Sequence, residues 1–256
     1  MTQIKIHIAD DLQSDRRSDP FMHTLRATCS QCNLRELCLP LGLSTSELDR
    51  IDDMMGSRRR ILRGQHLYSA GDPFSAIYAV RSGFFKTGLL AEDGRDQVTG
   101  FQMGGEILGM DGIGNDMHTC NAVALEDSEV CTIPFAELEH LSTEIRSLQT
   151  HIHKVMSREI VRDQNVMMML GSMRAEERLA AFLINLSQRF ATRGYAADEF
   201  HLRMTREEIG SYLGLKLETV SRTLSRFQEE GLISVQQKHI RLLDTSALQR
   251  IMHTCR

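Results

Sequence analysis

The chain has 256 residues, of which 41% are hydrophobic and 25% charged, and a formal net charge of −4. This length allows two compact units with cores of their own, and no apolar run is long enough to cross a bilayer. The slightly acidic balance excludes a protein that coats nucleic acid through its overall charge, and residues 1–20 lack the apolar stretch of a secretory signal, so we expect a cytoplasmic protein with no membrane partner.

Cys29, Cys32 and Cys38 stand close together in the N-terminal region, which we expect to be flexible over residues 1–43. In a reducing compartment, clustered cysteines bind metals or undergo redox chemistry more often than they form structural disulfides. A thiol oxidoreductase would place Cys29-x2-Cys32 at a helix start in an alternating strand–helix fold, and no such alternation surrounds this motif. An iron–sulfur cluster, a zinc site and a dithiol switch remain open, since thiolates suit all three.

Residues 44–137 predict a sensor domain built mainly of short strands. Ser44 and Glu47 have the spacing of a capping box, so we expect a short helix at the start of this domain. From residue 61 to residue 133, short apolar stretches alternate with turns that contain glycine. Strands and turns at this spacing are typical of an antiparallel roll or barrel.

A long helical stretch is expected after Pro134 as far as about residue 170, and residues 138–171 are assigned to a dimerisation helix. Apolar residues recur along it at intervals of 4, 3, 4 and 3, with one carboxylate among them, which is the pattern of a coiled-coil seam. The same helix of a second subunit is the expected partner, because two-fold dimers are the commonest oligomers. The alternative is that this stripe packs on the roll of its own chain. The seam consists of Met156, Ile160, Asp163, Met167 and Leu170.

Residues 172–256 predict a winged helix-turn-helix. They carry 13 Lys and Arg against 10 Asp and Glu, so the basic surplus is local to this part. Thr205 and Glu208 form a second capping box, Gly214 marks a helix end, and a second helix is expected over about 217–230, followed by a hairpin. These features together indicate DNA binding, whereas a Glu–Arg pair on a helix would alone be an ordinary surface feature.

The second helix of this motif would enter the major groove with its N-terminal residues first. Glu218 and Arg222 are four residues apart and therefore project from one face. Arginine can donate two hydrogen bonds to guanine, and glutamate can accept one from the cytosine amino group. We expect base contacts from Leu217, Glu218, Ser221 and Arg222, and phosphate contacts from Arg206 and Thr219.

Six segments form a recognisable set: Cys29-x2-Cys32-x5-Cys38-Leu-Pro40, Ala79-Val-Arg-Ser-Gly83, Gln97-Val-Thr-Gly-Phe101, Val130-Cys-Thr-Ile-Pro-Phe135, Ala175-Glu-Glu-Arg-Leu-Ala-Ala-Phe182 and Ile209-Gly-Ser-Tyr-Leu-Gly-Leu215. In these segments the chain resembles the CRP/FNR superfamily of bacterial transcription regulators, and within it the fumarate-and-nitrate-reduction (FNR) branch. The resemblance implies a regulator rather than an enzyme. It also implies an α+β fold with a cluster-binding N-terminus, an antiparallel β-roll like that of cyclic-nucleotide-binding domains, a long dimerisation helix and a C-terminal winged helix-turn-helix.

The resemblance further implies a cofactor and partners. An oxygen-labile 4Fe–4S cluster, one per subunit, would promote a homodimer that binds a palindromic TTGAT-type operator in double-stranded DNA. With RNA polymerase, the dimer would control genes of anaerobic or microaerobic metabolism as an activator, and oxygen would end DNA binding. Cys29, Cys32 and Cys38 would be cluster ligands, and Cys131 takes the fourth position because it precedes Ile-Pro-Phe, although Cys120 competes with it.

Other residues match the family pattern or depart from it. Ile160, Asp163 and Met167 match positions at the subunit interface, where two desolvated Asp163 carboxylates would repel and keep the dimer marginal. Glu218, Ser221 and Arg222 match the residues that read a TTGAT-type half-site. The Arg-Ser pair that grips a cyclic phosphate in nucleotide-binding relatives is replaced here by His118-Thr119, which argues against a cyclic nucleotide ligand.

Overall fold

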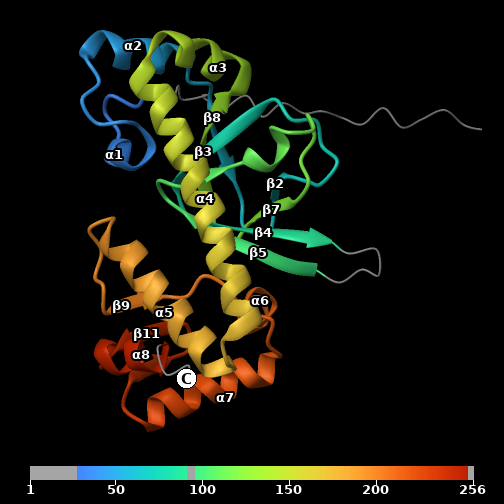
Figure 1. Ribbon diagram of the computed structural model, residues 1–256, viewed down its shortest axis with the longest axis vertical. Coiled ribbons are helices and arrows are strands. Elements are labelled where there is room, and N and C mark those ends of the chain that lie inside the picture. The colour runs from blue at the N-terminus through green and yellow to red at the C-terminus, as the bar shows by residue number, and fades with distance from the viewer. Residues whose placement is uncertain (1–27, 91–95, 253–256) are drawn as a thin grey trace, which may run out of the picture.

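The computed structural model describes residues 28–90 and 96–252, so residues 1–27 of the expected N-terminal region lie outside it, as does Cys255. A β-roll and a helical C-terminal half lie at opposite ends of one long helix, α4 (Arg146–Ser172) (Figure 1). This is the mixed α+β architecture that the sequence predicts. Among the described residues, no helix is both long and apolar enough to cross a membrane.

Two four-stranded antiparallel sheets form the β-roll, with strand orders β1-β8-β3-β6 and β2-β7-β4-β5. The first sheet consists of β1 (Arg58–Ile61), β8 (Ser128–Pro134), β3 (Ala76–Ser82) and β6 (Ile107–Leu108). The second consists of β2 (His66–Tyr68), β7 (Asn121–Ala124), β4 (Phe84–Leu90) and β5 (Asp96–Met103). A short 3-10 turn, η1 (Met110–Gly112), follows β6.

The first sheet carries a core on each face. Along β3, Tyr78 and Val80 join the inner core between the two sheets, whereas Ile77 and Ala79 join an outer core on the opposite face. Side chains alternate because a strand has a period of two, which explains the continuous apolar run in β3. Helices α2 (Thr45–Met54) and α3 (Phe135–Glu144), with the start of α4, complete the outer core. The capping box predicted for α2 is present.

The helical stretch expected after Pro134 is two helices rather than one. Ile145, between α3 and α4, takes an extended conformation with φ −107° and ψ 94°. Just before it, the hydroxyls of Ser142 and Thr143 donate to backbone carbonyl oxygens of the preceding turn. Such bonds compete with helix continuation, and Ile145 is buried in the outer core, so its side chain fixes the corner.

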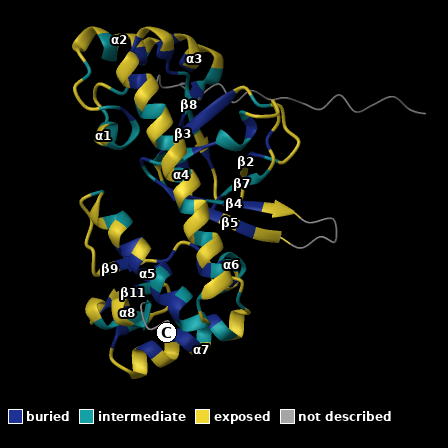
Figure 2. Ribbon diagram, in the orientation of Figure 1, coloured by how far each residue is buried: buried dark blue, intermediate teal, exposed yellow. Residues whose placement is uncertain are grey.

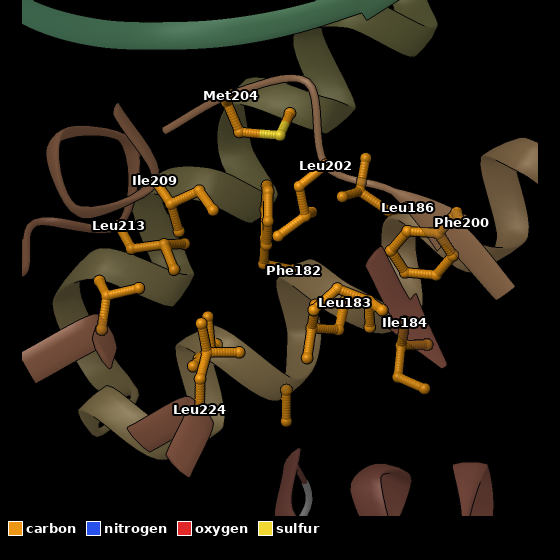
Figure 3. Packing of buried hydrophobic residues seen from close by; sticks show 14 of the residues in the cluster. Phe182, Leu183, Ile184, Leu186, Phe200, Leu202, Met204, Ile209, Leu213 and Leu224 are labelled. Atoms are coloured by element: carbon orange, nitrogen blue, oxygen red, sulfur yellow. The ribbon is translucent and has the colours of Figure 1, made fainter. Parts of the chain in front are cut away.

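The C-terminal half is a winged helix-turn-helix, as predicted. Phe182, Leu183, Ile209, Leu213 and Leu224 come from three helices and meet in one buried core (Figure 3). Two elements, β9 and α8, are not predicted from the sequence, because such short segments carry little periodicity. The elements are α5 (Ala175–Ala191), β9 (Glu199–His201), α6 (Arg206–Leu213), α7 (Leu217–Glu229), β10 (Ile233–Gln236), β11 (His239–Leu242) and α8 (Thr245–Met252).

Gly210 is the residue on which the turn between α6 and α7 depends. A Cβ atom at this position would lie 2.6 Å from the backbone oxygen of Leu215, an atom that cannot move aside without moving the turn. We expect Gly210→Ala to lower the free energy of unfolding by about 1–3 kcal/mol, measured by urea denaturation. Gly171→Ala is the matched control, because a Cβ atom there meets open space. Equal stability of the two variants would contradict this prediction.

Candidate functional site

Three cysteines of the N-terminal segment and one cysteine of β8 come together on the outer face of the first sheet. Cys29 and Cys38 pack against the outer core, to which the buried Cys131 belongs. The thiols of Cys29, Cys32, Cys38 and Cys131 are near enough for their charges to interact. The segment folds back on itself through a hydrogen bond of 3.1 Å from Cys32 N to Cys29 O and through the single helical turn α1 (Arg35–Cys38).

Cys120, the competing candidate, lies against the inner core instead. Burial raises the pKa of its thiol to about 12, and the nearby Asp111 carboxylate adds to the shift. In β8, Val130 belongs to the inner core and Cys131 to the outer one, because neighbouring residues of a strand face opposite sides. The first sheet therefore separates Cys120 from the four converging thiols.

Asp52 of α2 fixes the start of the cysteine segment. Its carboxylate accepts a hydrogen bond from the amide of Cys29, and its Oδ2 accepts one from the hydroxyl of Ser30 at 2.6 Å. The sequence predicts the helix that contains Asp52, but nothing in its pattern indicates that this acid faces the cysteines. Asp52 acts through the backbone of Cys29 and is a positioning residue of the site.

The thiols lie in surroundings that favour their protonated form. Burial raises the pKa of Cys29 and that of Cys38 to about 12. Burial also raises the pKa of Cys131, although the guanidinium groups of Arg81 and Arg58 oppose this effect. A metal bound here would have to displace the thiol protons, so binding would release protons to the solvent.

The donor set of four thiols suits an iron–sulfur cluster and also suits one zinc ion. Four cysteine thiolates hold clusters of this kind, and zinc accepts the same donors. Within residues 28–90 and 96–252, no group of three or more His, Cys, Asp or Glu side chains converges closely enough to hold one ion. Each cysteine of a four-iron cluster binds a different iron atom, so its ligands need not converge on one point. The four thiols can therefore serve as the ligands of a cluster of this kind.

α4 carries an apolar stripe that its own chain leaves exposed (Figure 2). The exposed fractions of Met156, Ile160 and Met167 are 38%, 57% and 64%, and Asp163 is exposed among them. Leu170, the last predicted member of the seam, is half-buried and lies against the end of α6. Ile160, Asp163 and Met167 are thus left uncovered by the part of the chain that the structure describes, whereas Met156 is only partly exposed.

The helix-turn-helix presents its expected DNA-facing residues at the surface. Thr205 caps α6 by accepting a hydrogen bond of 3.1 Å from the amide of Glu208, and Gly214 ends the helix with φ 62°. α7 lies at the end of the molecule remote from the β-roll (Figure 1). Leu217, Glu218 and Arg222 are exposed, and Ser221, Thr219 and Arg206 are half-buried.

A half-buried carboxylate joins the β-roll to the C-terminal half. Glu106, just before β6, accepts hydrogen bonds from Arg189 of α5 at 2.6 and 3.0 Å and from Arg193, two residues beyond the end of α5, at 2.6 Å. Arg189 and Arg162 of α4 also donate to the carbonyl oxygen of Phe101 in β5. Burial alone would raise the pKa of Glu106, but the three guanidinium groups outweigh it and lower this pKa.

The loop that carries Glu106 also touches the cysteine segment. A Cβ atom on Gly105 would lie 2.6 Å from Leu37 Cδ1, so α1 packs directly on the backbone of this loop. The positive charge of Arg193 is near enough to Cys38 to oppose the rise in the pKa of its thiol. The sequence does not predict this junction; its one signal is a pair of arginines four residues apart, one in the last turn of α5 and one just beyond it.

Two family models match the chain. The cyclic nucleotide-binding domain matches residues 58–144, and the Crp-like helix-turn-helix domain matches residues 177–251. Among solved structures, FixK2 from Bradyrhizobium japonicum superposes with a TM-score of 0.71 at 27% identity, covering 77% of this chain and 96% of that one. The two matched regions correspond to the β-roll with α3 and to the winged helix-turn-helix.

Curated relatives align over most of the chain. The transcriptional regulatory protein btr of Bordetella pertussis is 49% identical over 226 residues, covering 88% of this chain and 93% of the relative. The transcriptional activator protein anr of Pseudomonas aeruginosa is 44% identical, with coverages of 87% and 91%. The fumarate and nitrate reduction regulatory protein of Escherichia coli is also 44% identical, with coverages of 87% and 89%. The chain belongs to the CRP/FNR family of DNA-binding transcription regulators and is not an enzyme.

Proposed function

We propose that the protein is an oxygen-responsive transcription regulator that holds one 4Fe–4S cluster per subunit through Cys29, Cys32, Cys38 and Cys131. The observation that carries the proposal is the convergence of three thiols of the N-terminal segment with one thiol of β8. Two relatives are named for anaerobic regulation and for fumarate and nitrate reduction. The controlled genes are therefore those of anaerobic or microaerobic metabolism.

The cysteine segment links the cofactor site to α4. When bound, the cluster supplies an oxygen-sensitive connection between the N-terminal segment and the β-roll. Asp52 holds the backbone of Cys29, and His151 of α4 donates a hydrogen bond to the backbone carbonyl oxygen of Cys38. An ordered segment thus contacts α4 directly, and release of the segment removes that contact.

The exposed stripe on α4 is the surface that we assign to a homodimer. Its apolar side chains are buried when the same helix of a second subunit packs against them. Asp163 on this stripe opposes dimerisation, because burying two facing carboxylates costs free energy. A marginal dimer needs only a few kcal/mol of differential stability to shift between its monomeric and dimeric states.

Two copies of α7, one per subunit, would read the two half-sites of a palindromic TTGAT-type operator. RNA polymerase is the further partner that we propose, in contact with exposed loops of the β-roll.

Arg222→Ala is expected to weaken binding to this operator by about 5- to 150-fold, the equivalent of ~1–3 kcal/mol for one bidentate contact to guanine. The exposed side chain of Arg222 allows this contact. Fluorescence anisotropy at fixed salt measures the effect, because salt alone changes such affinities. Arg250→Ala on α8 is the control, since it removes the same charge outside α6 and α7. Equal losses in the two variants would assign Arg222 a purely electrostatic role.

One experiment tests the proposed function directly. Protein purified without air is analysed for iron and acid-labile sulfide, and its binding to a TTGAT–ATCAA duplex is measured before and after exposure to air. We expect a coloured protein whose absorbance and DNA binding are lost together in air. A colourless protein whose DNA binding follows chelators or thiol reductants would favour a zinc site or a thiol switch and would overturn the proposal.

The interior of the β-roll argues against a cyclic nucleotide as the signal. The rings of Tyr68 and His118 stack at 3.8 Å with an angle of 11° between their planes, and Phe74 meets His118 edge-on. The carboxylate of Asp111 lies 3.4 Å from Nδ1 of His118, where it would repel a phosphate. In nucleotide-binding members of the family, an arginine grips the phosphate in this region.

A further inference from the structure

A small apolar cavity lies next to Cys38, beneath the start of α4, and its volume is about 50 Å³. The outer face of the first sheet contributes Ile77 and Ile133 to its wall, and α4 contributes Ile152 and Val155. Cys38 itself forms part of the wall. A molecule in this cavity would therefore lie against the cysteine segment.

The wall offers almost nothing to a polar ligand. Cys38 and His151 line the cavity, and its other lining side chains are aliphatic, aromatic or methionine. One ring nitrogen of His151 is used by the carbonyl oxygen of Cys38, and its Nε2 has no hydrogen-bond partner among the residues that the structure describes. A buried water needs at least two polar partners, so one nitrogen does not retain it. Apolar cavities of this kind stay dry and bind small apolar molecules.

We propose that this cavity is a binding site for dioxygen, held beside Cys38 by dispersion contacts alone. The inference rests on the proposed function, because dioxygen matters here only if Cys38 holds a cluster. The volume exceeds that of one water molecule and is far below the cavity that accommodates an aromatic ring. A diatomic gas combines the required size with the required lack of polarity. The cavity thereby raises the local concentration of dioxygen at one ligand of the cluster.

The competing occupant is a side chain of a second subunit. Met156 lines the cavity, belongs to the exposed stripe of α4 and is 38% exposed, so it lies where a partner helix would approach. A partner side chain that filled the cavity would exclude gas from it. Xenon, an apolar gas atom, distinguishes the two occupants because it binds only where space remains in the assembled protein.

The first measurement is independent of the cluster. Methyl resonances of full-length protein, prepared without air, are followed by NMR under increasing xenon pressure. We expect saturable shifts for the methyl groups of Ile77 and Ile133, and loss of these shifts in Val155→Phe, which fills the cavity from α4. Val161→Phe is the matched control on the same helix, because Val161 does not line this cavity. Val155→Ile, which adds one methylene, gives a partial effect and replaces Val155→Phe if that variant does not fold.

The second measurement compares two oxidants on cluster-loaded protein. We expect Val155→Phe to slow the loss of visible absorbance in air by about threefold or more, whereas Val161→Phe leaves it unchanged, because only the first variant removes the apolar site. Ferricyanide is too large and too polar for the cavity, so its rate should be the same in all variants. Absent xenon shifts, or an unchanged rate in air when the cavity is filled, would overturn the proposal. Protein without iron that still binds xenon would refute the proposed function and leave an apolar gas site with no link to a cluster.

Discussion

Replacing Cys131 with serine is expected to abolish the iron, the acid-labile sulfide and the visible colour of protein prepared without air. A 4Fe–4S cluster of this type is held by four cysteine thiolates, and Cys131 is the one that β8 supplies. Serine has nearly the shape of cysteine, so we expect the variant to keep its fold, which circular dichroism checks. Iron analysis and absorbance then report the loss of the cofactor alone.

Cys120→Ser is the matched control for this experiment. Cys120 lies against the inner core, on the other side of the first sheet from the converging thiols, and its substitution is expected to leave iron content and colour unchanged. The pair of variants therefore separates the ligand from the bystander. Colour that survives without Cys131, or disappears without Cys120, would reverse the assignment.

Glu106→Gln is expected to lower the free energy of unfolding by about 3–5 kcal/mol, because it leaves two partly buried guanidinium groups without their carboxylate. The side chains of Arg189 and Arg193 are only 17% and 8% exposed. Urea denaturation measures the change. Glu144→Gln is the control, since it breaks an ion pair with Arg50 that is exposed to solvent and is expected to cost little. Similar losses in both variants would show that burial of Glu106 does not strengthen its interactions.

The lowered pKa of Glu106 also predicts a dependence of stability on pH. The folded protein holds the pKa of this carboxyl below the value of about 4.3 that an unfolded chain gives it. Its stabilisation is therefore complete above pH ~4.3 and is lost as the pH falls through the lower, folded value. Unfolding free energies measured between about pH 5 and pH 3 should fall more steeply for the wild type than for Glu106→Gln. Identical slopes would contradict the prediction.

The sequence is most informative where a local pattern determines the structure. The capping boxes that begin α2 and α6, the turn at Gly214 and the hairpin of β10 and β11 all follow from residues near one another in the chain. These features are confirmed because tertiary contacts do not have to override them.

The unpredicted features depend on contacts between distant segments. The break between α3 and α4 at Ile145 depends on the outer core that buries its side chain, and no local sequence pattern predicts that core. The sequence around Asp52 and around Glu106 is typical of surface residues. The fold nevertheless places Asp52 beside Cys29 and Glu106 beside Arg189 of α5. The assignments of ligands, seam residues and base-reading residues remain predictions, and the variants of Cys131 and Arg222 test the first and the last of them.

The arginine in the last turn of α5 and the one just beyond this helix have a consequence for how such regulators can be recombined. Arg189 and Arg193 belong to the DNA-binding half, yet they hold a loop of the β-roll, and the charge of Arg193 reaches Cys38. The two halves are therefore not interchangeable modules. A chimaera with a foreign helix-turn-helix joined after residue 172 would leave Glu106 without its counter-ions. The exception is a donor domain that carries basic residues at the positions of Arg189 and Arg193.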